Sequence, residues 1–235
     1  MKRIWVVLCV LVTLVASMET ISAATYTIKV SEDTFCDTRF PDNPNIPNDN
    51  KYLWGGWQKY GQTAKAHAFF KFDLSSIPPT EQIVSVRFYA YCNYAFGGDP
   101  NTDRADIHYC SDDNWSDSTL TWNNQPSYDA TVLDSLYIPT ADRWYSWDVT
   151  PVATMNSDNI LTLVIDGNYE DGGGSATFWR DFEADEYSGT NEAYIVVETI
   201  PTAVPAPEFD SLVVALAILL TSPAFAYLIA KRRII

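Results

Sequence analysis

Aromatic side chains gather in one short stretch of the sequence, "YLWGGWQKY", which lacks the alternation of a strand. The stretch places four rings around two adjacent glycines: Tyr52, Trp54, Trp57 and Tyr60. Flat aromatic faces pack against the apolar side of a sugar ring, while planar polar groups bind its hydroxyls. We therefore expect these residues, together with Trp179, to be candidates for binding a glycan. The alternative is that one of the tryptophans plugs an end of the fold.

Carboxylates form a second candidate group. Asp33 and Asp37 lie in "SEDTFCDT", and Asp73 and Asp148 close two later predicted strands. Ca²⁺ takes oxygen ligands from carboxylates and backbone carbonyls. One structural calcium is therefore the candidate cofactor, although none of these stretches has the spacing of an EF-hand loop. No other cofactor is predicted.

Recognisable catalytic motifs are absent from the sequence. It contains no Gly-x-Ser-x-Gly, no His-Glu-x-x-His and no phosphate-binding loop. The two histidines, His67 and His108, both lie inside predicted strands, where a histidine usually packs or faces the surface. Carboxylate pairs of the glycosidase kind stay open because carboxylates are abundant. We predict that the chain is not an enzyme, with a polysaccharide-active enzyme as the least favoured alternative.

Four cysteines and one glycosylation sequon complete the reactive residues. Cys9 lies in the leader described below, which leaves an odd number of thiols. Cys92 and Cys110 end two successive predicted strands, so they are the preferred disulfide pair. Three buried free thiols, including Cys36, are the alternative. Asn114 begins the sequon Asn-Trp-Ser and is a candidate N-glycosylation site.

The charge of the chain excludes one class of function. Thirty acidic residues against fifteen basic ones give a formal net charge of −15. A general nucleic-acid binder needs a basic face, so no nucleic-acid partner is expected. An acidic surface suits an exported protein that must stay soluble.

The elements that must position these residues are strands. Residues 25–199 contain short runs such as "TYTIKV", "AHAFFKFDL" and "QIVSVRFYAYCNY", separated by breakers such as "SSIPPTE" and "FGGDPNTD". No helix-length apolar period occurs among them. Strands at this spacing predict one all-β domain, a sandwich or a barrel.

Both ends of the chain are apolar. Residues 1–24 carry two basic residues, a short apolar core and a small-residue cleavage site, which predicts a signal peptide. Residues 200–209 form a proline-rich spacer. Residues 210–235 contain 19 uncharged residues followed by Lys231-Arg232-Arg233, which predicts one C-terminal transmembrane helix with a cytoplasmic end. We therefore expect an exported domain at the outer face of the cytoplasmic membrane.

The C-terminal segment also resembles a sorting signal. Pro207-Glu208-Phe209, the apolar stretch and the basic cluster stand in the order of the PEF-CTERM tail of archaeal surface proteins. The resemblance implies that an archaeosortase-like processing enzyme removes the tail and that a lipid replaces it as the membrane attachment. A permanent transmembrane anchor is the alternative.

Four stretches of the domain carry a family resemblance: "EDTFCDT", "AFFKFDLSSIPPTEQIVSVRFYAY", "NWSDSTLTWNNQPSYDAT" and "RWYSWDVT". In this order they resemble the DNRLRE domain, a carbohydrate-binding-module-like domain of disaggregatase-related proteins. The resemblance covers residues 25–199 and implies a jelly-roll type β-sandwich that binds polysaccharide without catalysis. The segment around "YLWGGWQKYGQTAKA" departs from the family pattern. A structural or adhesion envelope protein that contacts other proteins is the alternative function.

Overall fold

The structure is a computed structural model that describes residues 23–44, 52–59, 63–154, 159–168, 176–185, 187 and 190–202. Within this set, residues 23–200 belong to one compact unit. Residues 1–22 of the predicted signal peptide, Tyr60, the Pro207-Glu208-Phe209 motif and the predicted C-terminal helix lie outside the described residues. No helix in the described part is long and apolar enough to span a membrane.

The described residues form an all-β fold, as the sequence predicts. Their strands are β1 (Ala24–Lys29), β2 (Glu32–Asp37), β3 (Tyr52–Gln58), β4 (Ala64–Asp73), β5 (Glu81–Gly97), β6 (Ala105–Cys110), β7 (Val132–Leu136), β8 (Arg143–Asp148), β9 (Ile160–Gly167), β10 (Thr177–Glu183) and β11 (Tyr194–Pro201). One 3₁₀ turn, η1 (Thr150–Thr154), follows β8.

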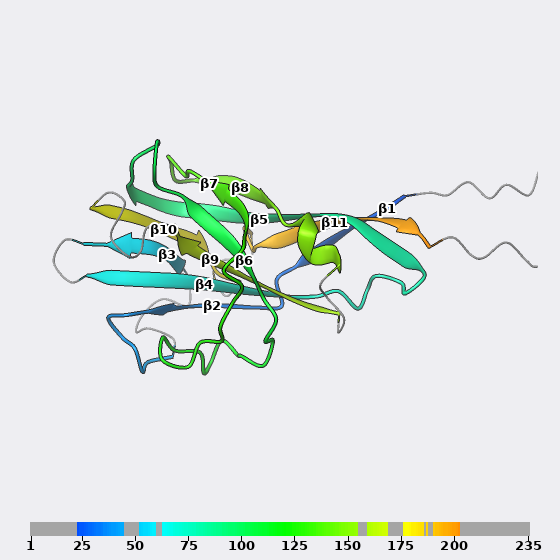
Figure 1. Cartoon of the computed structure of the whole chain (residues 1–235), viewed down its shortest axis with the longest axis horizontal. Helices are drawn as coiled ribbons and strands as arrows, with labels where there is room; N and C mark the ends of the chain where they lie inside the picture. Colours follow the sequence, from blue (N-terminus) through cyan, green and yellow to red (C-terminus); the bar gives the residue numbers. More distant parts are fainter. Residues whose placement is uncertain are drawn as a thin grey trace, which may run out of the picture. The chain divides into compact units, whose positions relative to one another are not determined.

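The strands pair in one curled antiparallel sheet, in the order β1-β11-β5-β10-β3-β4-β9-β6-β7, with β2 on β4 and β8 on β5. Figure 1 shows the result as two facing layers, with β5, β10 and β11 in one and β2, β4 and β9 in the other. Strand β3 joins the layers because it pairs with β10 along its length and with β4 at its end. The sandwich is thus a single folded-over sheet, not two separate ones.

Glycine makes this crossing possible. Gly56 has a φ of +114°, which favours glycine, and a Cβ at this position would lie 2.0 Å from the carbonyl oxygen of Phe178. The pair "GG" therefore belongs to a strand that bends between layers. The prediction that this stretch is not a strand is therefore wrong, because the glycine pair hides the alternation of β3.

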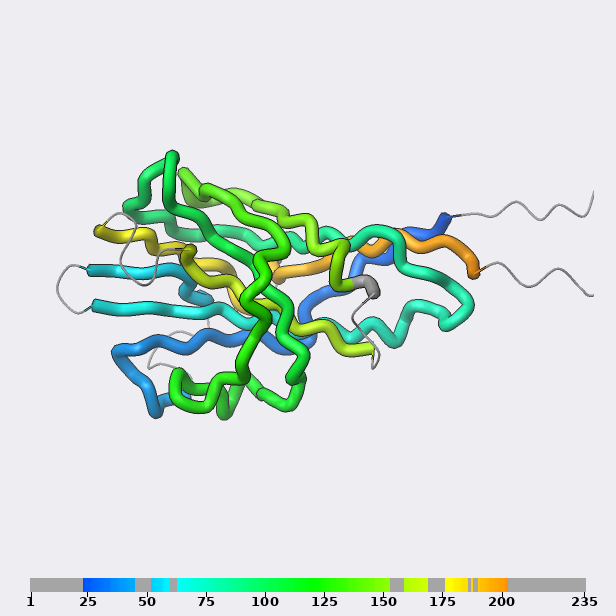
Figure 2. The backbone as a smooth tube through the Cα atoms, in the orientation of Figure 1, coloured from blue at the N-terminus to red at the C-terminus, as the bar shows by residue number. Residues whose placement is uncertain are grey.

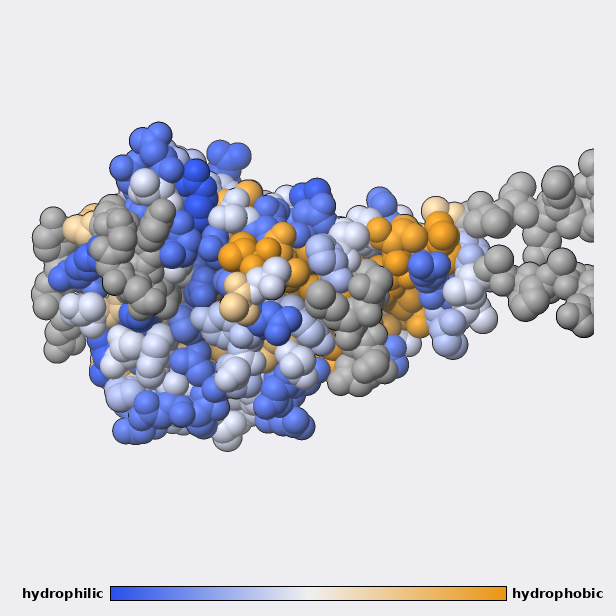
Figure 3. Space-filling model, in the orientation of Figure 1, coloured by the Kyte–Doolittle hydropathy of each residue, from blue (hydrophilic) through white to orange (hydrophobic). Residues whose placement is uncertain are grey.

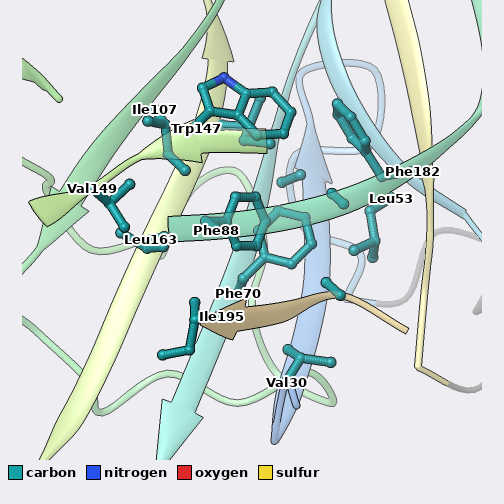
Figure 4. Close-up of a cluster of buried hydrophobic side chains, with 14 of the residues drawn as sticks. Val30, Leu53, Phe70, Phe88, Ile107, Trp147, Val149, Leu163, Phe182 and Ile195 are labelled. Atoms are coloured by element: carbon teal, nitrogen blue, oxygen red, sulfur yellow. The ribbon is translucent and has the colours of Figure 1, made fainter. Parts of the chain in front are cut away.

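The main hydrophobic core fills the space between the layers. Figure 4 shows Phe88 and Trp147 packed toward Phe70, with Leu163 and Phe182 nearby. The Phe70 and Phe88 ring centroids are 5.0 Å apart, and those of Phe88 and Trp147 are 5.5 Å apart. Each such side chain contributes about 1.5–3 kcal/mol by leaving water.

A second cluster covers the outer face of β4 and β9. The segment 111–131 lies below the sheet beside β2 (Figure 2, green). It packs Trp115 and Leu120 against Phe69 and Val164. The Trp115 indole donates a hydrogen bond to Thr162 Oγ1 at 3.2 Å, so its polar atom is satisfied. The segment contains the stretch "NWSDSTLTWNNQPSYD", which therefore covers one face of the sheet.

The predicted disulfide is wrong. Cys36, Cys92 and Cys110 are free and buried. Cys92 points from β5 into the main core, whereas Cys110 points from β6 into the second cluster. Burial raises the pKa of the Cys92 thiol to about 12 and that of Cys110 to about 11. The two successive strands end in different parts of the fold, which their spacing in the sequence does not reveal.

Candidate functional site

The outer face of β3, β10 and β5 gathers aromatic side chains. Trp179 on β10 lies between Gly56 of β3 and Phe96 of β5 in the strand register, and the next outward residue, Asp181, lies between Trp54 and Tyr94. Because strand side chains alternate between faces, these residues share the face opposite the core residues of β10. This arrangement brings together two of the predicted ligand residues, Trp54 and Trp179.

Two rings on this face are open to solvent. Phe96 is 56% exposed and Tyr94 is 48% exposed. Their ring centroids are 6.3 Å apart and their planes differ by 9°, so they present nearly parallel surfaces. A strand holds them, and strand positions are more rigid than loop positions. We call this exposed pair of parallel rings the platform, and neither ring was among the residues predicted to bind a glycan.

The aromatic surface continues along β5. Tyr89 stacks on Tyr194 of β11 at 4.7 Å with an 8° angle between the planes. Trp144 of β8 contacts Tyr91 at 5.5 Å and Tyr194 at 5.2 Å. All four are partly buried, and burial raises the pKa of Tyr194. We call the set the aromatic face, and it comprises Trp54, Tyr89, Tyr91, Tyr94, Phe96, Trp144, Trp179 and Tyr194.

Polar groups stand between the two halves of the aromatic face. The register between β5 and β10 shifts near Asn93, which is the extra residue of a bulge. The Asn93 side-chain amide donates to Glu183 Oε2 at 3.1 Å, and the Asn191 amide donates to the same oxygen at 3.1 Å. The side chain of Glu183 therefore has a fixed orientation at the edge of the face.

A buried arginine positions the strand end that carries Phe96. Arg180 is 1% exposed and points inward. Its guanidinium donates to the carbonyls of Phe96 at 3.0 Å and Gly97 at 3.1 Å, and its Nε donates to Ile138 at 2.8 Å. It also lies 4.0 Å from the ring of Phe178. Burial lowers the Arg180 pKa. These bonds fix the backbone beneath the exposed ring.

A second arginine covers part of the face. Arg39 lies 4.9 Å from the Trp54 ring and 5.0 Å from the Trp179 ring, and it pairs with Asp37. Trp179 is consequently only 8% exposed, and Trp54 is partly buried. Trp179, which was predicted to bind a glycan, is therefore not open to a ligand. It lies opposite Phe96 in the register of β10 and β5.

Two further predicted ligand residues are not on an open surface. Trp57 is 1% exposed and stacks on Phe178 at 5.1 Å inside the core, where a sugar cannot reach it. Tyr52 is partly buried and contacts Tyr187 at 5.3 Å. The expectation for Trp57 fails because β3 alternates, so that Trp54 and Trp57 fall on opposite faces across the two glycines.

The four predicted calcium ligands do not share a site. Asp33 is buried and accepts the backbone N–H of Asp185, and Asp37 binds Arg39. Asp73 and Asp148 are exposed. The backbone N–H of Ser75 lowers the pKa of Asp73, and the side chain and backbone of Thr150 lower that of Asp148. Asp37 and Asp73 stand near opposite ends of the paired strands β2 and β4, about 23 Å apart along β4 at 3.3 Å per residue.

A different set of titratable side chains does converge, on the outer face of β6 and β9. The ligand atoms of Asp106, His108 and Asp166 all lie within 4.8 Å of one another. Tyr128, from the covering segment, donates to Asp166 Oδ2 at 2.7 Å. Ser135 of β7 donates to Asp106. Both histidines thus pack, as the sequence suggests, but His108 packs against two carboxylates.

Burial and charge shift the pKa values in this cluster. Burial raises the pKa of Asp106. Burial opposes the charged form of His108, but its hydrogen bond to Asp166 and that carboxylate's charge outweigh this and raise the His108 pKa. Burial likewise opposes the charged form of Asp166, while the interactions with His108 and Tyr128 lower its pKa.

The predicted glycosylation residue lies on the surface. Asn114 is exposed in the segment after β6, and its side-chain amide donates to Asp112 Oδ1 at 2.9 Å. It lines a small polar pocket with Asp112, Trp115 and Thr119. Glycosylation at this position stays a prediction.

Residues 24–199 match the model of carbohydrate-binding module family 96. The chain belongs to this family. The match covers the whole described sheet, from β1 into β11, and so includes the aromatic face. No protein of curated function matches the chain. A family 96 module is a binding module, and this agrees with the absence of catalytic motifs from the sequence.

The sequence contains a pattern that indicates the platform residues. In "FYAYCNYAFGG" aromatic residues stand at 89, 91, 94 and 96, with one extra residue between the pairs. The strand was expected to end at Tyr94, whereas β5 continues to Gly97. The bulge at Asn93 restores the alternation, so that both pairs of rings face outward.

Proposed function

We propose that this family 96 module is a non-catalytic protein that holds envelope or matrix polysaccharide on its aromatic face. The observation that carries the proposal is the pair of exposed, nearly parallel rings of Tyr94 and Phe96 on one strand. Most of the surface drawn in Figure 3 is hydrophilic, and contiguous exposed apolar patches on soluble proteins often mark binding sites.

The length of the face supports a chain of sugars over a single one. Its rings run along β5 from Tyr89 to Phe96, seven residues, which is about 23 Å at 3.3 Å per residue. At mid-length Glu183 is 2% exposed and bonded to Asn93, so the contacts proposed for this face come from the rings. Because the rings sit on paired strands, little ordering entropy is lost on binding.

Charge favours a neutral polysaccharide over an anionic one. Asp181 and Glu183 lie on or beside the face, and the chain carries a net charge of −15. Arg39, the cation that covers Trp54 and Trp179, is already paired with Asp37. An anionic polymer would therefore meet repulsion that weakens as salt is added.

We further propose that the module is exported and held at the outer face of the cytoplasmic membrane. Residues 1–24 support export, and residues 200–235 support attachment through a C-terminal helix or through a lipid added by an archaeosortase-like enzyme. A structural calcium stays part of the proposal without assigned ligands, since Asp33, Asp37, Asp73 and Asp148 do not gather.

A polysaccharide array read with calcium and again with chelator tests the function. The proposal expects binding to at least one extended polysaccharide, and the chelator arm shows whether calcium supports it. A folded protein that binds no glycan in either arm would contradict the proposal. That outcome would favour the alternative, a structural or adhesion protein that contacts other envelope proteins.

A further inference from the structure

The cluster formed by Asp106, His108 and Asp166 lies away from the aromatic face, under the covering segment. Asp106 and Asp166 are directly opposite each other in the register of β6 and β9. His108 follows two residues after Asp106 on the same strand, so all three side chains share one face. Asp106 is 7% exposed and His108 is 5% exposed.

The hydrogen bonding of His108 fixes how its ring is used. Its Nδ1 lies 2.8 Å from the carbonyl oxygen of Asp129, which can only accept, so Nδ1 carries a proton. Nε2 faces Asp166 Oδ1 at 3.3 Å. In the neutral ring this nitrogen offers a lone pair toward a carboxylate. A histidine whose one ring nitrogen donates to a backbone carbonyl is oriented to bind a metal ion through the other nitrogen.

Two carboxylates bring negative charge together in the cluster. They stand directly opposite on paired strands, an arrangement that is destabilising without a cation. His108 can supply at most one positive charge, while Arg104 and His67 act on the two carboxylates from further away. Tyr128 and Ser135 contribute neutral hydroxyl donors that orient the carboxylates. A divalent cation among the three ligand atoms would balance both acids.

We propose that Asp106, His108 and Asp166 form a binding site for a dication of the Zn²⁺ class. One imidazole nitrogen and two carboxylates suit Zn²⁺ and its first-row neighbours, whereas Ca²⁺ takes six to eight oxygens. The ion ties β6 to β9. Through Tyr128 and Asp129 it also fixes the covering segment 111–131. The site is independent of glycan binding at the aromatic face.

Titration of metal-free protein with Zn²⁺ tests the proposal. We expect one equivalent to bind, and the melting temperature to rise by about 5–10 °C when free Zn²⁺ is a hundredfold above the Kd. Ca²⁺ should produce neither effect. His108→Ala and Asp166→Asn should weaken Zn²⁺ binding at least a hundredfold. The matched control, Asp73→Asn, should keep it, because Asp73 is an exposed carboxylate outside the three-ligand group.

Nitrogen-15 spectra of the wild-type protein keep the test independent of how the variants fold. The chain has two histidines, so the assignment needs only one variant. Zn²⁺ should move the Nε2 resonance of His108 much further than that of His67, which contacts the cluster only through Tyr128. Overturning results would be a His108 resonance that stays that of an imidazolium in the presence of Zn²⁺, or Zn²⁺ affinity unchanged in His108→Ala.

Discussion

Replacing Phe96 by alanine should weaken polysaccharide binding while leaving the domain stable. Phe96 is 56% exposed, and a phenyl side chain presents about 200 Å², so roughly 110 Å² of it faces solvent. A sugar ring stacked on one face covers about half of this, roughly 55 Å², which is worth ~1.4 kcal/mol at about 25 cal/mol per Å². The Kd should therefore rise about tenfold.

The cost in stability should be small because the ring is mostly in water already. A surface substitution of this kind changes the free energy of unfolding by at most about 0.5 kcal/mol, or about 1–2 °C in melting temperature. Titration calorimetry with the best polysaccharide from the array measures the affinity, and a thermal melt measures stability. The matched control is Val84→Ala, which truncates an exposed apolar residue earlier on β5.

Two results would refute this reasoning. Unchanged affinity in Phe96→Ala, with an intact melt, would show that the exposed ring does not contact the ligand. An equal loss in Phe96→Ala and Val84→Ala would show that the binding surface is not confined to the aromatic face.

Four further predictions concern the core, the support of Phe96, the thiols and the C-terminal segment. Trp57→Ala should cost about 3–5 kcal/mol of stability in a denaturant melt, because the ring is 1% exposed; a loss below about 1 kcal/mol would contradict its place in the core. Arg180→Met should lower both stability and glycan affinity, because the guanidinium holds the carbonyls under Phe96; unchanged calorimetric affinity would remove its positioning role. Thiol alkylation at pH 8 should be slow in the native protein and rapid in denaturant, because the pKa of Cys92 is raised to about 12 and the thiolate forms only above that range; fast native labelling of Cys92 would contradict its burial. Intact mass of the cell-derived protein should lack residues 210–235, and a mass that includes them would leave a permanent anchor.

Sequence patterns predict most of the strands but not their partners, and they do not show that Tyr52–Gln58 is a strand. In "AHAFFKFDL" the alternation puts Phe70 and Phe72 on one face, which is the core face in the structure. In "RWYSWDV" it puts Trp144 and Trp147 on opposite faces, and Trp147 is the core residue. Local alternation fixes which residues share a face of one strand. It does not say which strand lies opposite, and that is why the Cys92–Cys110 pairing failed.

The candidate sites show the same limit. Trp54 and Trp57 are close in sequence and were predicted to bind one ligand together. They lie three residues apart on a strand, however, so their side chains face opposite sides. Asp106 and Asp166 meet because β6 pairs with β9 across 60 residues of sequence, a long-range pairing that no short motif encodes. Tyr94 and Phe96 were within reach of pattern analysis, since a one-residue bulge keeps two aromatic pairs in step.

Mapping the bound polysaccharide by backbone and side-chain chemical shifts tests the central claim most directly. The account predicts that the largest shift changes fall on Tyr94, Phe96 and their neighbours along β5 and β10, with little change in the covering segment 111–131. Shift changes concentrated in that segment, or at the Asp106–His108–Asp166 cluster, would contradict the assignment of glycan binding to the aromatic face.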